Sequence, residues 1–243
     1  MREFRRPWIR VMLLALAAAF VPACGDDSDD DPAPPPAPNN PPAQQPTVLF
    51  QDDFGSGFPA TSWTSPSSTG PGPTITLTNA EGNPVPALAM TTTMGVGPGP
   101  GPVVGWTDCT TSVTGAPFTA SAQMQVPDHG EGSGSIGIFD GLGNPLAAAE
   151  WHPTSSFGGV TFMISGAPST VVVAPPSPGS TFRPFSFSVD STGLATWSLN
   201  GSPVMSQSGF PAGPYRLRLY IIVTTASGPF ATFNVDNVLI TAP

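Results

Sequence analysis

Apolar and polar residues alternate with a period of two along much of the chain after residue 47. In residues 118–126 the apolar positions are Phe118, Ala120, Ala122, Met124 and Val126, and polar residues fill the places between them. Residues 185–189, 195–199 and 215–223 alternate in the same way. This period is that of a β-strand with one face on a core, and no segment carries a helical stripe of useful length. The pattern therefore predicts an all-β domain.

Turn residues separate these segments at short intervals. Gly-Leu-Gly-Asn-Pro occupies residues 141–145, Asp-Ser-Thr-Gly residues 190–193 and Asn-Gly residues 200–201. Such sequences connect antiparallel strands in hairpins. We expect about twelve to fourteen strands in a single sandwich, because the spacing suits that architecture and no fixed internal repeat is present.

The first 31 residues have a different character. Arginines at positions 2, 5, 6 and 10 precede an apolar run at 11–20, and Cys24 opens the acidic run 25–31. The apolar run is too short to span a membrane, which takes about 20 residues. This order resembles a bacterial lipoprotein signal peptide, although an ordinary secretory signal is the alternative. The resemblance implies that residues 1–23 are removed and that the sulfur of Cys24 carries a lipid.

Residues 24–46 are predicted to be a disordered linker, since their acidic and proline-rich composition cannot form a core. The remaining residues, 47–243, are then the β-sandwich domain. Acidic residues directly after the lipidated cysteine also resemble the export tags of surface lipoproteins. We therefore expect a protein of the bacterial cell envelope that is attached to the outer membrane or cell surface through its lipid.

The charge of the domain excludes one class of partner. Residues 47–243 contain ten acidic residues, three arginines and no lysine, a formal net charge of −7. Such a surface repels phosphate backbones, so nucleic acid is excluded as a partner.

Cys24 and Cys109 are the only cysteines. If Cys24 is lipidated, Cys109 has no disulfide partner, and we expect it to be buried as a small apolar side chain.

The two ends of the domain resemble those of a known fold family. Residues 48–54, followed by Trp63, and residues 231–241 look like the first and last strands of a concanavalin A-like lectin/glucanase domain. Residues 185–201 are similar to a hairpin of the same domains. The resemblance implies a single antiparallel jelly-roll β-sandwich with its first and last strands close together, and it suggests carbohydrate as a ligand.

The sequence favours binding without catalysis. Family 16 glucanases of this fold use Glu-x-Asp-x-x-Glu to place two carboxylates on one face, and that motif is absent here. Glu81, Glu131 and Glu150 stand in unlike contexts, and no Gly-x-Ser-x-Gly motif accompanies His129 or His152. We expect a domain that binds a glycan or an extracellular protein. A divergent glycoside hydrolase or polysaccharide lyase and a structural surface protein without ligand are the alternatives.

One strand supplies the main candidate binding residues. In residues 215–223, alternation sends Arg216, Arg218 and Tyr220 to the face opposite the core. Together they could contact a sugar or a carboxylate, or the arginines could pair with neighbouring acids. Trp106 follows the Gly- and Pro-rich segment 95–102, and we expect it, and less directly Trp63, to offer a flat ring to a ligand.

Two further sets of residues are candidates. Glu150 and His152 share a face while Trp151 points to the other, so the first two could hold a ligand but are too few for a metal site. Asp52 and Asp53 near the first strand and Asp236 on the last could bind a structural calcium if those strands are adjacent. The alternative is that these aspartates accept hydrogen bonds from loop amides.

Overall fold

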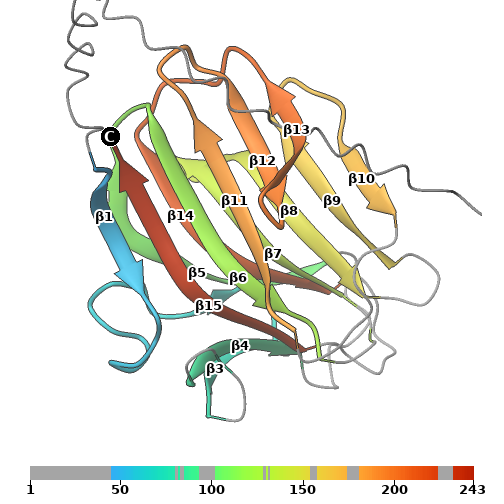
Figure 1. Ribbon diagram of the computed structural model, residues 1–243. Coiled ribbons are helices and arrows are strands. Elements are labelled where there is room, and N and C mark those ends of the chain that lie inside the picture. The colour runs from blue at the N-terminus through green and yellow to red at the C-terminus, as the bar shows by residue number, and fades with distance from the viewer. Residues whose placement is uncertain are drawn as a thin grey trace, which may run out of the picture. The chain divides into compact units, whose positions relative to one another are not determined.

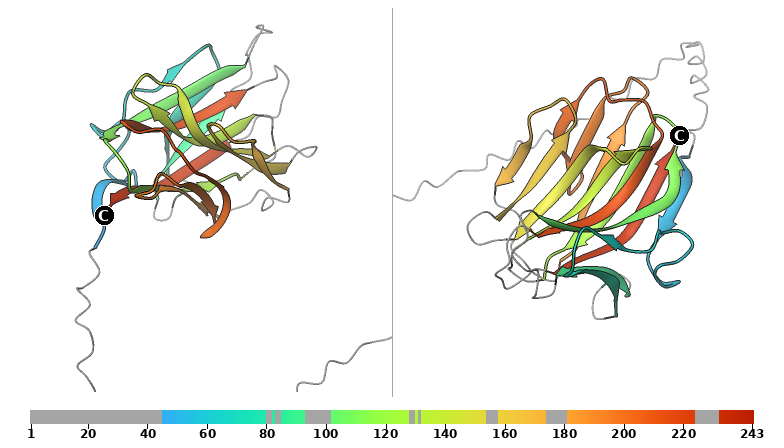
Figure 2. Two further views of the ribbon diagram at one scale, coloured as in Figure 1. Left: turned by 90° about the horizontal axis from the view of Figure 1, so that it is seen from above. Right: turned by 180° about the vertical axis from the view of Figure 1, so that it is seen from behind.

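The chain folds into two packed antiparallel β-sheets (Figures 1 and 2). The structure is a computed structural model that describes residues 45–79, 82, 85–92, 102–127, 130, 132–153, 158–173, 181–223 and 232–243. It contains fifteen strands and no helix in this part, so the prediction of an all-β sandwich is confirmed. The strands exceed the expected number by one or more.

The predicted signal peptide, Cys24 and nearly all of the predicted linker lie outside the described residues. His129, Glu81 and Glu131 also lie outside them. Within the described part of the chain, no helix is long and apolar enough to cross a membrane.

The first sheet has eight strands and includes both ends of the domain. Its order is β13-β12-β11-β6-β15-β4-β3, and β1 pairs with β15 beside this path. The bounds are β1 (Thr47–Asp52), β3 (Pro73–Thr78), β4 (Ala87–Thr92), β6 (Phe118–Gln125), β11 (Arg183–Val189), β12 (Ala195–Leu199), β13 (Ser202–Gln207) and β15 (Thr232–Ala242).

The second sheet has seven strands in the order β10-β9-β8-β7-β14-β5-β2. It is the rear layer in the view of Figure 1. The bounds are β2 (Ser67–Ser68), β5 (Val103–Val113), β7 (Ser133–Asp140), β8 (Pro145–Pro153), β9 (Gly158–Ile164), β10 (Thr170–Val173) and β14 (Tyr215–Val223).

The predicted alternation is confirmed on the strands that suggested it. β6, β11 and β12 bury every second residue, as their sequences indicate. The turn between β12 and β13 is formed by Asn200 and Gly201, whose φ angles are 53° and 76°. Two successive positive φ angles match the twist of a two-residue hairpin, which explains the choice of Asn-Gly there.

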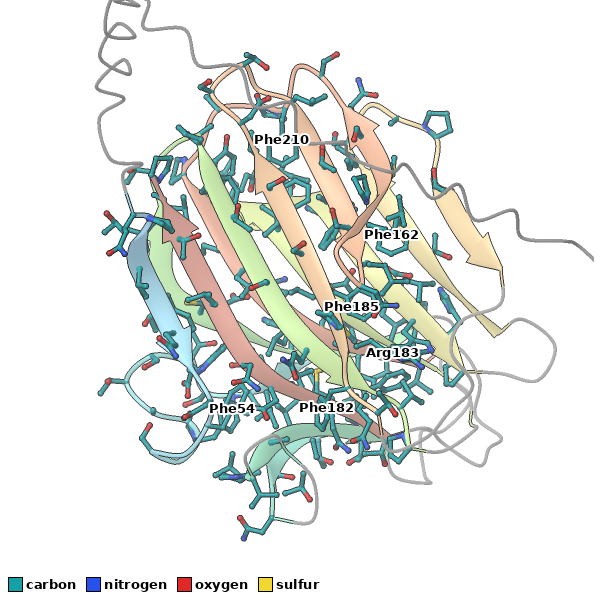
Figure 3. All side chains as sticks on the ribbon, in the orientation of Figure 1. Phe54, Phe162, Phe182, Arg183, Phe185 and Phe210 are labelled. Carbon is teal, nitrogen blue, oxygen red and sulfur yellow. The ribbon has the colours of Figure 1, made fainter. Side chains whose placement is uncertain are left out.

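Aromatic rings fill the space between the sheets (Figure 3). Trp197 on β12 is fully buried, and its ring lies 4.9 Å from that of Phe187 and 6.0 Å from that of Phe162. Phe162 comes from the other sheet, so this cluster joins the two layers. Cys109 is buried in the same core, as predicted, and burial raises the pKa of its thiol to about 11.

The first and last strands are adjacent, as the resemblance implies. β1 pairs with the second half of β15, with Asp52 opposite Val238, while β4 pairs with the first half. Between the two halves the register with β6 shifts, and Asn237 adopts a φ of 49°. β15 is thus a long strand that pairs with β4 along its first half and with β1 along its second half.

Candidate functional site: the outer face of the seven-stranded sheet

Alternation along β14 defines an outer face, the face of the seven-stranded sheet turned away from the core. Leu217, Leu219 and Ile221 point into the core. Arg218 and Tyr220 point the other way, as predicted, and pack with residues of neighbouring strands.

The register of the sheet brings side chains of five strands into rows on this face. One row contains Trp106, Tyr220, Ser135, Glu150 and Thr161. The next row contains Asp108, Arg218, Gly137, Ala148 and Met163.

Apolar side chains form a second cluster on the outer face, separate from the main core. Phe139 and Tyr220 are its buried rings, packed edge to face with their centroids 5.9 Å apart. Gly137 lies under both rings, since a Cβ at that position would be 2.7 Å from Phe139 and 3.0 Å from Tyr220. A larger residue at this position would therefore force the ring of Phe139 to move.

Arg218 is held by Asp108 on the neighbouring strand. Its Nε and Nη2 atoms donate to the two carboxylate oxygens of Asp108 at 2.6 and 2.9 Å, a bidentate pair. The guanidinium carbon also lies 4.3 Å from the ring centre of Phe139 and 5.3 Å from that of Trp106. The alternative interpretation, in which an arginine pairs with an acid, is thus confirmed for Arg218.

A second polar group joins β14 to β8. The hydroxyl of Tyr220 donates to Glu150 Oε1 at 3.2 Å, and His152 Nε2 lies 3.7 Å from Glu150 Oε2. Trp151, between them in sequence, points into the core as predicted. The sequence predicts Tyr220 and the Glu150–His152 pair as two separate candidate sites, and the structure brings them together.

Burial sets the protonation of this group. The pKa of Tyr220 is raised, chiefly because the side chain is only 6% exposed and also because Glu150 is near, so its hydroxyl stays protonated. Burial lowers the pKa of His152, against the opposing effect of Glu150. Since the ordinary histidine pKa is about 6.5, the imidazole is neutral at pH 7.

The predicted binding residues differ in how far their side chains are exposed and in where they lie. Trp106 lies within β5, directly opposite Tyr220, and is half-buried. Arg216 is exposed and stands opposite Phe139, on the far side of Arg218 from Tyr220. Trp63 is a correction to the sequence interpretation, because it is 3% exposed in the core between the sheets and cannot offer its ring to a ligand.

Sequence reasoning missed two members of this face, Asp108 and Phe139. Asp108 stands two residues after Trp106, so the period of two could have placed its carboxylate on the same face. Phe139 carried no such signal, because β7 is buried on both faces and shows no clear alternation.

Asp108 and Glu150, the carboxylates that the described residues place on the outer face, are too far apart for glycoside hydrolysis. Asp108 lies on β5 and Glu150 on β8, so their backbones are separated by three strand spacings of about 4.8 Å, or about 14 Å, which two such short side chains do not close to the distance of a catalytic pair. Retaining enzymes need about 5 to 5.5 Å and inverting enzymes about 6.5 to 9.5 Å. Asp108 is also occupied by Arg218. These two residues therefore do not form a glycosidase pair.

The structure places the proposed calcium ligands on adjacent strands but gives them protein partners. The carboxylate of Asp52 accepts from Phe54 N at 2.7 Å and from Trp63 Nε1 at 2.8 Å, Asp53 accepts from Gly55 N, and Asp236 accepts from Asn237 N. Among the described residues no three His, Cys, Asp or Glu side chains gather as a metal site. Calcium binding stays a prediction, which melting with and without a chelator would test.

No family model matches the chain, and no curated protein matches it. Solved structures do match. The Crh5 transglycosylase in complex with NAG is 17% identical over 82% of this chain and 88% of its own, with a TM-score of 0.57. The carbohydrate recognition domain of Emp47p is 9% identical over 82% and 98%, with a TM-score of 0.57. The catalytic domain of an endo-1,3-beta-glucanase (laminarinase) from Thermotoga petrophila RKU-1 is 11% identical over 81% and 98%, with a TM-score of 0.54. At these identities the likeness establishes the fold, a concanavalin A-like β-sandwich of the kind found in glycosidases and lectins.

Proposed function

We propose that this protein is a lipid-anchored component of the bacterial cell envelope whose β-sandwich binds glycan, without catalysis, on the outer face of the seven-stranded sheet. The observation that carries the proposal is the composition of that face. A half-buried tryptophan, Trp106, stands beside the fixed Arg218–Asp108 pair, and Glu150, which accepts a hydrogen bond from Tyr220, lies three strands away in the same row.

This combination fits the chemistry of sugars. A sugar ring has an apolar face that packs on an aromatic ring, and hydroxyls at its rim that exchange hydrogen bonds with polar side chains. Arg218 and Glu150 are held in place by Asp108 and Tyr220, so a ligand would lose little conformational entropy in ordering them. The three similar structures are a transglycosylase in complex with NAG, a carbohydrate recognition domain and an endo-1,3-beta-glucanase, and this gives further support.

The envelope location rests on the sequence of residues 1–31. A lipid on Cys24 and the proline-rich linker would hold the domain away from the membrane, where a polysaccharide is accessible. Incorporation of a labelled fatty acid into the wild-type chain but not into Cys24→Ala tests the anchor, and equal labelling of both chains would contradict it.

Retention on polysaccharide tests the binding function. The full chain in detergent should be retained on an insoluble glycan and should release no sugar product. Trp106→Ala should lose most of this retention, because truncation of a tryptophan that anchors a binding site costs about 2 kcal/mol or more. The control is Thr196→Ala, on the outer face of the other sheet, which should be retained like the wild type. Retention that Trp106→Ala leaves intact, or retention on no glycan, contradicts the proposal.

A second candidate function is that of a divergent glycoside hydrolase or polysaccharide lyase. The observation in its favour is the neutral imidazole of His152 beside Glu150 and Tyr220, because such groups can accept and donate protons. The same experiment separates the two functions. Release of oligosaccharide by the wild type, and its loss in His152→Ala, would establish the enzyme.

A further inference from the structure

The outer face carries an acid, Glu150, that pairs with no arginine among the described residues. Of the three arginines of the domain, Arg218 is paired with Asp108, and Arg183 lies on β11 of the other sheet. Arg216 is on β14 but stands four residues before Tyr220, with Arg218 between them. The rise of about 3.4 Å per residue therefore places Arg216 more than 10 Å along the strand from the Tyr220–Glu150 row.

The groups around Glu150 are neutral. Tyr220 donates one hydrogen bond to it, and the imidazole of His152 is uncharged at pH 7. Ser135 and Thr161 flank it in the row on β7 and β9. The side chain of Glu150 is 16% exposed, so it is partly removed from water but still reaches the surface.

A partly buried carboxylate without a counter-ion attracts a cation more strongly than an exposed one does, since less water screens it. Trp106 lies in the same row, three strands away, and its ring already has the guanidinium carbon of Arg218 5.3 Å from its centre, so it serves here as a surface for a sugar ring and not as a cation site. The domain has a net charge of −7 and no lysine, so its long-range field draws in cations and repels anions. The partly buried carboxylate and the net charge of the domain both favour a cationic ligand.

We propose that the glycan bound on this face carries free amino groups, as in a glucosamine polymer, and that Glu150 binds the ammonium of one sugar residue while Trp106 packs on the ring of another, three strands away. This inference rests on the proposed function and names the class of glycan. Uronic, sulfated and sialylated glycans are correspondingly excluded as favoured ligands, because they would meet Glu150 with the same sign of charge.

The test compares two oligosaccharides of equal length, a hexamer of glucosamine and a hexamer of N-acetylglucosamine, titrated into the full chain in detergent at pH 7, where His152 is neutral. The wild type should bind the free amine about tenfold more tightly, the effect of about one charge-assisted hydrogen bond. Glu150→Gln should reduce this preference to near unity, because Gln keeps the shape and an acceptor for Tyr220 but lacks the charge.

A matched control separates local from overall charge. Asp53→Asn also removes one negative charge, but Asp53 is exposed and directly follows β1 of the eight-stranded sheet. This variant should keep the preference for the glucosamine hexamer. A second measurement needs no variant, since raising the ionic strength should reduce the preference of the wild type.

The outcomes distinguish this inference from the proposed function. Equal affinity of the wild type for the two hexamers overturns the inference and leaves glycan binding standing. A tenfold preference that persists in Glu150→Gln, or that Asp53→Asn removes equally, also overturns it. Binding to neither hexamer nor to any polysaccharide overturns both proposals.

Discussion

The outer faces of the two sheets follow the same alternation but carry different chemistry. On the eight-stranded sheet, the positions between the core residues of β6, β11 and β12 are small and polar: Thr119, Ser121, Gln123, Ser186, Ser188, Thr196 and Ser198. Their contacts are between neutral groups, such as the 2.9 Å hydrogen bond that joins the hydroxyls of Thr196 and Ser206. On the seven-stranded sheet, equivalent positions of β5, β7 and β14 carry aromatic rings and a bidentate ion pair.

This difference indicates where function lies. A hydroxyl-rich face needs nothing beyond water, and it is what the alternation of a half-buried antiparallel sheet predicts. A face that holds Phe139 and Tyr220 over a glycine and fixes Arg218 with Asp108 departs from that rule. Departures from local rules are expected at functional sites, because they carry a cost in stability or solubility.

The largest expected effect comes from breaking the ion pair. Arg218→Ala would leave the carboxylate of Asp108, whose side chain is 13% exposed, without its two donors. We expect the free energy of unfolding to fall by about 2–4 kcal/mol, as measured by denaturant titration.

The control for this substitution is Arg216→Ala on the same strand. Arg216 is exposed, and its replacement should change stability by less than about 0.5 kcal/mol. Equal effects of the two substitutions would show that the Arg218–Asp108 pair does not stabilise the face.

A smaller effect separates the two faces by their hydroxyl groups. Tyr220→Phe removes a hydrogen bond to a carboxylate, and we expect a loss of about 1 kcal/mol. Thr196→Val removes a neutral pair near solvent, and its effect should stay within about 0.5 kcal/mol. A loss for Thr196→Val as large as that for Tyr220→Phe would mean that the two faces are energetically alike.

Much of the fold could be predicted from the sequence because its determinants are local. The period of two identified β6, β11, β12 and β14, and Asn200-Gly201 predicted a hairpin that the structure contains. The adjacency of β1 and β15 came from the resemblance of the two ends to a known fold, since nothing local specifies that pairing.

The site could be predicted only in part, because its contacts cross strands that are distant in the chain. Alternation placed Arg218 and Tyr220 on the outer face but could not supply the partner of either residue. The partner of Arg218 depends on a register shift, in which Arg216 lies opposite Ser112 and Arg218 opposite Asp108. Nothing in the sequence of β5 indicates that it has extra residues at this shift. Alternation assigns a residue to a face of the sheet but does not tell how closely its neighbours pack against it, so it could not predict that Tyr220 is buried.

The central claim, that glycan binds on the outer face of the seven-stranded sheet, can be tested by fluorine NMR. Trp106 is the half-buried tryptophan on that face, whereas Trp63, Trp151 and Trp197 are at most 3% exposed in the core between the sheets. In the full chain labelled with 5-fluorotryptophan, Trp106→Phe identifies the resonance of Trp106. Titration with glucosamine hexamer, or with whichever glycan retains the chain, should shift that resonance and leave those of the three core tryptophans in place. A ligand that binds while the Trp106 resonance does not move would contradict the account.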